Sequence, residues 1–204
     1  MYVRLSHQPR STADVLRVIE EHMFATMVTW SSEGALASHL PFLIDPARGE
    51  HGTLLAHMAR ANPHSALLGK GEESLVMFLG PHAYISPSWY EDRATAPTWD
   101  YVAVHCYGNA RCHSTDEARQ NIARLIAVVE APSPQPWSMS ELGETEVRRL
   151  LEHVVSFEIP ITRIEGKFKL NQGEKVARTQ AAIAHLEQNG EAAMAAYLRR
   201  YNDL

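Results

Sequence analysis

The sequence begins with short β-like runs joined by tight turns, and this spacing most limits what the chain can fold into. Residues 24–30 are rich in β-branched and aromatic side chains, and turn residues follow at 31–34. Residues 35–44 are expected to form the returning strand, and a turn at 45–49 leads to a third strand at 53–59. Parallel neighbours need a crossover of a dozen or more residues, so these strands must pair antiparallel. The segment predicts a meander.

The rest of the chain adds strands and late helices. Strands are expected at 74–79, 99–113 and 156–170, the last interrupted at Pro160, while 80–90 reads as a structured loop or a short edge strand. Helices are expected at 11–22, at 114–129, from 138 to 154 and, as a pair, over 174–201, with a short helix opening at Asn62. The pattern predicts a mainly β, α+β fold: a small antiparallel barrel of about six strands with peripheral helices. We expect one domain over 1–172 and a helical hairpin, 173–204, packed on it or extending from it.

Composition excludes several classes of protein. The chain has 204 residues, of which 45% are hydrophobic and 21% charged, which is typical of a globular protein with a proper core. The net charge of -5 disfavours a generally basic nucleic-acid binder. No apolar run approaches the roughly 20 residues of a membrane helix, and the start lacks a signal-like segment, so a soluble cytoplasmic protein is expected.

Eleven histidines suggest a metal protein, but the most tempting ligand set does not support one. His105-Cys106 and Cys112-His113 are expected on one strand, where the two cysteines would lie about 20 Å apart. The sequence contains no CxxC, HExxH or Gly-x-Ser-x-Gly motif. The sequence therefore predicts no metal site and identifies no catalytic residue.

The segment 57–64 has the features of a phosphate site. A strand ends there, Arg60 follows, and Asn62-Pro63 opens a helix whose first N–H groups attract anions. A guanidinium adds a permanent charge that suits phosphate. The alternative is that Arg60 pairs with a surface carboxylate and Asn62 only caps the helix.

Two further segments offer binding chemistry. Residues 84–90 combine three aromatic side chains with two hydroxyls, which suits a flat polar heterocycle or, alternatively, a core aromatic cluster. Lys167 and Lys169 share one face of the last strand, where they either neutralise a phosphate or are simply solvated.

Together, the segments 57–64, 80–90 (GPHAYISPSWY) and 166–172 resemble the PaiB family, which is described as FMN-binding negative transcriptional regulators. Further matches are Met1-Tyr2 and the segments 39–43, 97–102, 136–137 and 158–163, so the resemblance covers residues 1 to about 180. In the last motif, Phe168 and Asn171 replace the expected tryptophan and serine, so position 171 departs from the family pattern.

The resemblance implies the fold and the cofactor. The family is similar to the pyridoxamine-phosphate-oxidase-like split barrel, which is a homodimer that holds FMN at the subunit interface. This similarity implies a six-stranded barrel. It implies that Ser38 and His39 line the flavin ring and ribityl chain, with His57 nearby, and that a second group holds the phosphate: Arg60, Ala61 and Asn62. A third group would close the site, partly from the partner subunit: Ser86, Ser88, Trp89, Lys169 and Gln172.

Two functions follow from the resemblance. One is a flavin-binding repressor of transcription. However, the second tail helix is alanine-rich and basic only at Arg199-Arg200. Such a helix is better suited to covering the barrel than to reading DNA. The other is a flavin-dependent oxidoreductase in which His39, His57 or His82 exchanges protons near the ring.

Overall fold

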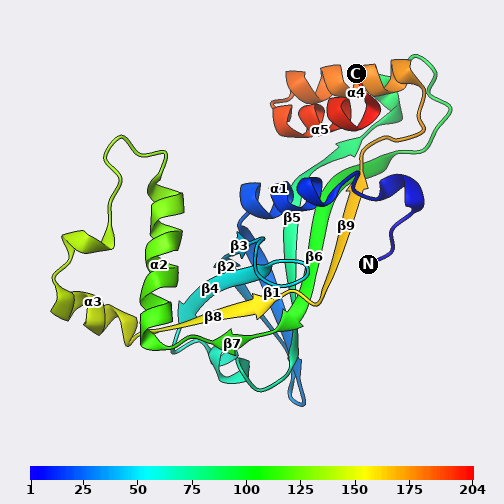
Figure 1. The fold of residues 1–204 in the computed structure, drawn as a ribbon. Helices are drawn as coiled ribbons and strands as arrows, with labels where there is room; N and C mark the ends of the chain where they lie inside the picture. Colours follow the sequence, from blue (N-terminus) through cyan, green and yellow to red (C-terminus); the bar gives the residue numbers. More distant parts are fainter. The chain divides into compact units, whose positions relative to one another are not determined.

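Nine strands form two antiparallel sheets in the computed structural model, which describes residues 1–204 (Figure 1). One sheet has the order β2-β1-β5-β6-β9 and the other β3-β4-β8-β7. The strands are β1 (Phe24–Ser31), β2 (Gly34–Pro41), β3 (Leu43–Asp45), β4 (Thr53–Ala59), β5 (Glu73–Ile85), β6 (Thr98–Asn109), β7 (Arg111–Cys112), β8 (Val154–Pro160) and β9 (Arg163–Lys169).

Five α-helices and four short 3-10 turns complete the mixed α+β fold. The helices are α1 (Thr12–Glu21), α2 (Thr115–Glu130), α3 (Glu144–Leu151), α4 (Val176–Gln188) and α5 (Ala192–Asn202). The 3-10 turns are η1 (Leu5–His7), η2 (Pro63–Leu67), η3 (Pro87–Trp89) and η4 (Met139–Glu141). None of the helices is long and apolar enough to cross a membrane. The α+β class is confirmed, and closure into a six-stranded barrel stays a prediction.

The chain divides into two compact units made of interleaved segments. The terminal unit comprises Met1–Glu21, Leu79–Val104 and Glu165–Leu204, and the central unit comprises His22–Phe78 and His105–Ile164. Strands β5 and β6 contribute residues to both units. The expected separation of 173–204 as a domain of its own stays a prediction.

The antiparallel pairing expected for the first strands of the central unit is confirmed, but the returning strand breaks at Phe42, so the expected meander is divided between two sheets. Strand β1 pairs with β2 from Phe24 opposite Pro41 to Ser31 opposite Gly34, while β3, after the break, pairs with β4 in the other sheet. The ring of Phe42 is fully buried and lies edge-on to Phe78 and Phe157, at 6.1 and 6.3 Å between centroids. Burial of this ring gives a reason for the break, which the alternation of side chains did not reveal.

The expectation of a single strand over 99–113 is also wrong. Strand β6 ends at Asn109, and the chain then joins the other sheet as β7, which pairs with β8. Gly108 is the point of close approach: a Cβ there would lie 2.3 Å from the carbonyl oxygen of Pro160. Cys106 and Cys112 therefore lie on different strands, one buried and one exposed, and the spacing along one strand no longer describes them.

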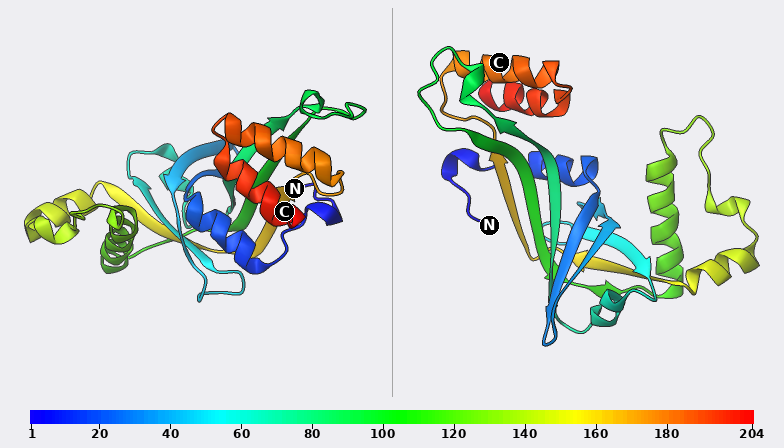
Figure 2. Two further views of the ribbon diagram at one scale, coloured as in Figure 1. Left: turned by 90° about the horizontal axis from the view of Figure 1, so that it is seen from above. Right: turned by 180° about the vertical axis from the view of Figure 1, so that it is seen from behind.

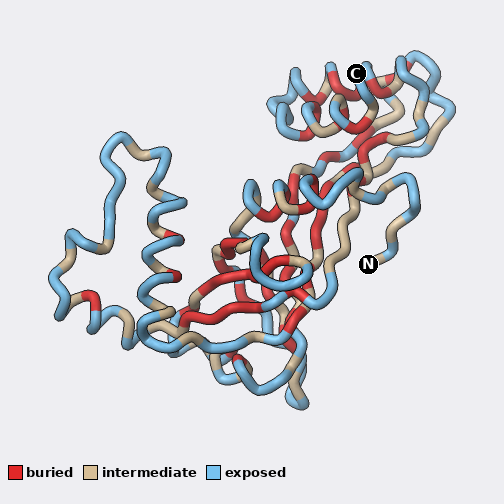
Figure 3. Tube along the Cα trace, in the orientation of Figure 1, coloured by how far each residue is buried: buried red, intermediate tan, exposed pale blue.

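The helices of the central unit follow the sequence in part. Helix α2 begins with the expected capping box of Ser114 and Glu117 and buries Leu125 against Leu43 and Leu55. The single helix expected from residue 138 is wrong, since η4 and α3 are separate. Figure 3 shows the connection between α2 and α3 as largely exposed.

In the terminal unit, β5 continues through Pro81 to Ile85, where a loop or short edge strand was expected. The pairing of β5 with β1 ends at Met77, so Pro81 lies beyond the ladder with β1. The two expected tail helices are confirmed as α4 and α5, which lie side by side (Figure 2). Phe168 is buried and stacks on Tyr201 of α5 with 5.1 Å between the ring centroids.

Candidate functional site

A buried chain of polar side chains lies in the central unit, on the segments where the phosphate site was expected. His64 bonds the hydroxyl of Ser38 through Nδ1 (3.0 Å) and that of Thr29 through Nε2 (2.8 Å). Asn62 donates to the Ser38 hydroxyl at 3.0 Å, and Ser74 extends the chain to Thr29 at 2.6 Å. Burial lowers the pKa of His64, so its ring is neutral near pH 7.

Neither His64 nor Thr29 was among the expected site residues. His64 is only 1% exposed, and a single sequence does not distinguish such a core histidine from a surface one. Its position in the second residue of a capped turn is the one signal that could have pointed to it.

Asn62 caps its turn as expected, but the turn is a five-residue 3-10 helix. The Asn62 side chain accepts from the N–H of His64 at 3.0 Å, and the Asn62 carbonyl accepts from the N–H of Ser65 at 2.9 Å. The first N–H groups therefore already have partners, and the expectation of free helix N–H groups is wrong at this position.

Arg60 binds backbone carbonyls rather than the surface carboxylate of one sequence alternative. Its Nε donates to the carbonyl of Glu152 and its Nη2 to that of Val154, both at 2.8 Å. No carboxylate pairs with it. The guanidinium is therefore held in one orientation by neutral groups, its charge is uncompensated, and three of its five N–H hydrogens remain for an anion.

The expected site residues next to one another on β2 point to opposite sides of the strand. Ser38 faces the buried side of β2, while His39 points to the exposed side, where its Nδ1 lies 3.0 Å from the hydroxyl of Thr26. Ala61 is exposed beside Arg60. His57 lines an apolar cavity with residues of α2 and α3, and its buried Nδ1 has no hydrogen-bond partner.

In the terminal unit, the serine and tryptophan residues of the 80–90 motif are engaged within the fold. Ser86 caps η3 and bonds the hydroxyl of Ser88 at 2.7 Å. The ring of Trp89 stacks on His185 of α4, with 5.2 Å between centroids and 16° between planes. This part of the motif packs against the tail hairpin.

The end of β9 holds an ion pair that the sequence did not indicate. Lys169 donates to the hydroxyl of Thr98 and the carbonyl of Trp99, and its Nζ lies 3.4 Å from Oδ1 of Asp100. Asp100 is 1% exposed, and burial raises its pKa to about 6 although Lys169 acts in the opposite direction. A carboxyl with such a pKa can take up and release a proton near neutrality.

The side chain of Gln172 forms hydrogen bonds with the backbone around the end of β9. Its side chain donates to the carbonyl of Phe168 and accepts from the N–H of Leu170 at 2.7 Å. Asn171, where the motif departs from its family, has a φ of 63° and donates to the hydroxyl of Thr179. Both side chains therefore bind within the chain.

An exposed group of rings lies on β5 and β6 of the terminal unit. Trp99 is 56% exposed, and its ring centroid lies 5.9 Å from that of His82 and 6.2 Å from that of Tyr84. Of the aromatic side chains expected to bind a heterocycle at 84–90, Tyr84 lies in this group, next to the Trp99 carbonyl that Lys169 binds.

The expected site residues thus form two sets on different compact units. The central set is Ser38, His39, His57, Arg60, Ala61 and Asn62, and the terminal set is Ser86, Ser88, Trp89, Lys169 and Gln172. Within each set the structure brings some members together: Ser38 with Asn62, and Ser86 with Ser88.

Comparison with known proteins agrees with these segments. A family model described as "Putative FMN-binding domain" matches residues 1–163. The chain is 31% identical over 187 residues to the protease synthase and sporulation protein PAI 2 of Bacillus subtilis, covering 92% of this chain and 89% of that protein.

Two solved structures share the fold at low sequence identity. The FAD and heme binding protein from Mycobacterium smegmatis has a TM-score of 0.60 at 13% identity, over 88% of this chain and 80% of that one. The flavocytochrome Anf3 from Azotobacter vinelandii has a TM-score of 0.56 at 11% identity, over 78% of this chain and 68% of that one. The family match and the identity to the Bacillus protein confirm the resemblance that the motifs indicated, and this chain belongs to the PaiB family of proteins with an FMN-binding domain.

Proposed function

We propose that this protein binds FMN through its phosphate at Arg60, as a split-barrel homodimer of the PaiB type. The observation that carries the proposal is the uncompensated guanidinium of Arg60, fixed by the carbonyls of Glu152 and Val154. A pre-oriented cation needs little reorganisation to receive a dianionic phosphate. Ala61 and Asn62 lie next to it in the chain and complete the proposed phosphate group.

An aromatic surface of the terminal unit, outside the two sets, suits a flat ring. Exposed aromatic surface such as Trp99 with His82 and Tyr84 can stack on a flat heterocycle. We assign the ring and ribityl chain to Ser38 and His39 of the central set. Bound FMN would supply redox chemistry, while the chain binds and orients it.

A homodimer is supported by one exposed strand face. Strand register places Phe24, Trp30 and His39 on the same side of β1 and β2, together with Ala35 and Ala37. Phe24 is 70% and Trp30 54% exposed, which is unusual for such large apolar side chains. A partner subunit that covers this face would also cover His39.

We propose negative regulation of transcription as the role, following the family, but without DNA reading by α5. Arg199 pairs with Glu187, and Arg200 pairs with Asp14, so the basic residues of α5 are already neutralised. The alternative role is a flavin-dependent oxidoreductase, in which the bound FMN would be the redox group.

The phosphate assignment is tested by titrating the apoprotein with FMN and with riboflavin, which lacks the phosphate, and following flavin fluorescence. Wild type should prefer FMN, and Arg60→Ala should lose that preference while riboflavin binding is unchanged. Arg17→Ala, which removes an exposed arginine elsewhere, should retain it. Equal affinity of wild type for both flavins contradicts the phosphate site, and no uptake of either flavin contradicts the proposal as a whole.

The two roles are separated by two further measurements. A salt-sensitive, sequence-selective gel shift with genomic fragments supports the regulator. Rapid bleaching of the bound flavin by NADH or NADPH supports the oxidoreductase.

A further inference from the structure

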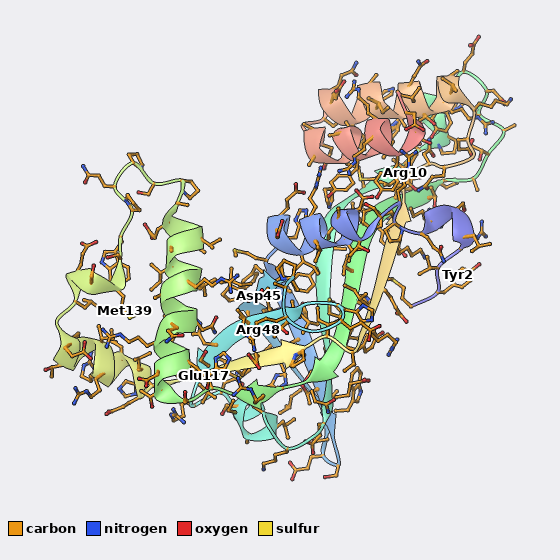
Figure 4. The ribbon with its side chains drawn as sticks, viewed as in Figure 1. Tyr2, Arg10, Asp45, Arg48, Glu117 and Met139 are labelled. Carbon is orange, nitrogen blue, oxygen red and sulfur yellow. The ribbon has the colours of Figure 1, made fainter.

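A polar pocket of about 290 Å³ lies in the central unit, between the turn that follows β3 and helix α2. Helix α2 contributes Glu117, Gln120 and Arg124 to its wall, the turn contributes Arg48, and β8 contributes Glu158. Figure 4 labels Arg48 and Glu117. Only one of the lining residues is apolar, and none belongs to the proposed flavin contacts. The pocket is therefore a separate site, suited to a polar ligand.

Two guanidinium groups from different elements line this pocket. Nη2 of Arg48 donates to Oε2 of Glu158 at 2.7 Å, and Nη1 of Arg124 donates to Oδ2 of Asp45 at 3.2 Å. Asp45 lies in the same turn as Arg48, whose N–H donates to the Asp45 carbonyl at 3.4 Å. Each guanidinium uses one of its five N–H hydrogens in these bonds, and about half of each side chain is exposed. Both therefore have donors left for a ligand.

The carboxylates of the wall already have donors at every oxygen. Glu158 accepts from Arg111 at Oε1 (2.9 Å) and from His113 at Oε2 (3.3 Å). Glu117 accepts from Arg111 at Oε1 and from the N–H of Ser114 at Oε2, both at 2.7 Å. The hydrogen bond from Arg111 and that from Ser114 lower the pKa of Glu117 to about 2, so it is ionised at neutral pH. The charged groups of the pocket thus offer unused donors to a ligand that accepts hydrogen bonds.

The charge around the pocket limits the charge of such a ligand. Apart from the imidazole of His113, three carboxylates lie in or next to the pocket, and three arginines balance them: Arg48, Arg111 and Arg124. A dianion would meet repulsion from the carboxylates without a net positive charge to offset it. A single carboxylate still gains charge-assisted hydrogen bonds, because its two oxygens match the planar guanidinium group.

We propose that this pocket binds a small, polar monocarboxylate whose two oxygens bond the guanidinium groups of Arg48 and Arg124. The exposed amide of Gln120 can bond a hydroxyl group of the same ligand, so a hydroxy acid suits the wall better than a fatty acid. The volume is about twice that of a known protein cavity of about 150 Å³ that accepts benzene, so a hydroxy acid of a few carbon atoms fits.

The test uses ¹⁵N NMR of the full chain, following the Nε–H resonances of Arg48 and Arg124 during titration with lactate and with lactamide. These probes have nearly the same shape, but lactamide lacks the charge. Lactate should shift both resonances and bind about 10-fold more tightly than lactamide, because it forms charge-assisted hydrogen bonds. Phosphate, a dianion, should bind these two arginines more weakly than lactate.

The matched variants lie on one helix. Arg124→Gln should weaken lactate binding about 10-fold. Arg119→Gln is the control, because Arg119 is also half-exposed on α2 and pairs with Glu144, outside the pocket. It should bind lactate as wild type does. Arg48→Gln removes the other guanidinium from a different element and should weaken binding to a similar extent, and circular dichroism checks that each variant folds.

Several outcomes would overturn the proposal. These are the absence of a shift of either resonance at about 20 mM lactate, equal binding of lactamide, and tighter binding of phosphate at the same arginines. Wild-type affinity in folded Arg124→Gln or Arg48→Gln, or an equal loss in Arg119→Gln, would also overturn it. FMN uptake is a separate measurement and should be the same in all three variants, so failure here is distinguishable from failure of the flavin proposal.

Discussion

Lys169 pairs with only one of the two carboxylate oxygens of Asp100. Nζ of Lys169 lies 3.4 Å from Oδ1 of Asp100, whereas Oδ2 of Asp100 is buried without a hydrogen-bond partner. One cation at this distance does not offset the loss of water around a carboxylate that is 1% exposed. The imbalance is the physical cause of the raised pKa of Asp100.

This imbalance predicts how Asp100→Asn changes the pH dependence of stability. The pKa of Asp100 rises from 3.8 to about 6 on folding, so its stabilising contribution is present below pH 3.8 and is lost as the pH rises to about 6. Urea unfolding at several pH values should show wild type losing on the order of 3 kcal/mol relative to Asp100→Asn across this range. Curves that stay parallel would contradict the assigned pKa.

A second prediction concerns His64, whose pKa is lowered by burial from its usual 6.5. Because its pKa is lowered on folding, the His64 imidazole stabilises the folded state above pH 6.5. This contribution is lost as the pH falls below 6.5, since the imidazole of the unfolded chain binds a proton at a higher pH than that of the folded chain. His64→Phe should remove this pH dependence and, by removing the bonds of the ring to Ser38 and Thr29, lower stability at neutral pH by about 2 kcal/mol.

Chemical denaturation of wild type and His64→Phe at pH 7 and at lower pH measures both effects. His153→Phe provides the matched control, because this side chain is exposed and should change neither quantity. A His64→Phe variant as stable as wild type would mean that the Ser38–His64 chain has no structural value.

The sequence predicted the helices and strands themselves better than the points at which the chain passes from one sheet to the other. Hydrophobic alternation identified the hairpin, α2 with its capping box and the tail helices, because these depend on local periodicity. The breaks at Phe42 and after Asn109 depend on contacts with distant residues such as Phe157 and Pro160. Local patterns carry no information on such contacts.

The candidate site divides in a similar way. Arg60 and Asn62 were found because a strand end, a cation and a cap are adjacent in the sequence. His64 and Asp100 were not, because their importance comes from burial, and a polar residue in one sequence gives no sign of it. The direction of His57 towards α2 and α3 follows from strand register, which only the fold determines.

A third prediction concerns Glu158, a nearly buried carboxylate on β8 that accepts from Arg48 at 2.7 Å, Arg111 at 2.9 Å and His113 at 3.3 Å. Figure 4 labels Arg48 and also Glu117, which Arg111 binds as well. Burial alone would raise the pKa of Glu158, but these donors outweigh it, and the pKa is lowered from 4.5.

Glu158→Gln should therefore destabilise the fold by about 2 kcal/mol, which is less than the roughly 3–5 kcal/mol of a fully buried broken pair because both arginines are half-exposed. Glu158 stabilises the folded state above pH 4.5, and this contribution is lost as the pH falls through its lowered pKa. The control is Glu146→Gln, which breaks an exposed pair with Arg149 and should cost less than about 1 kcal/mol. Equal losses in the two variants, measured by urea unfolding at pH 7, would rule out a special role for Glu158.

The last prediction tests the homodimer through Trp30, which is 54% exposed on the face of β1 that also carries Phe24. An ammonium group in an apolar interface is strongly unfavourable, so Trp30→Lys should dissociate the dimer. Light scattering after size exclusion should give wild type twice the chain mass of 22.8 kDa and the variant a single chain mass. Val176→Lys, at a similarly exposed apolar position on α4, should stay dimeric. A dimeric Trp30→Lys would place the interface elsewhere, whereas a monomeric wild type would refute the homodimer itself.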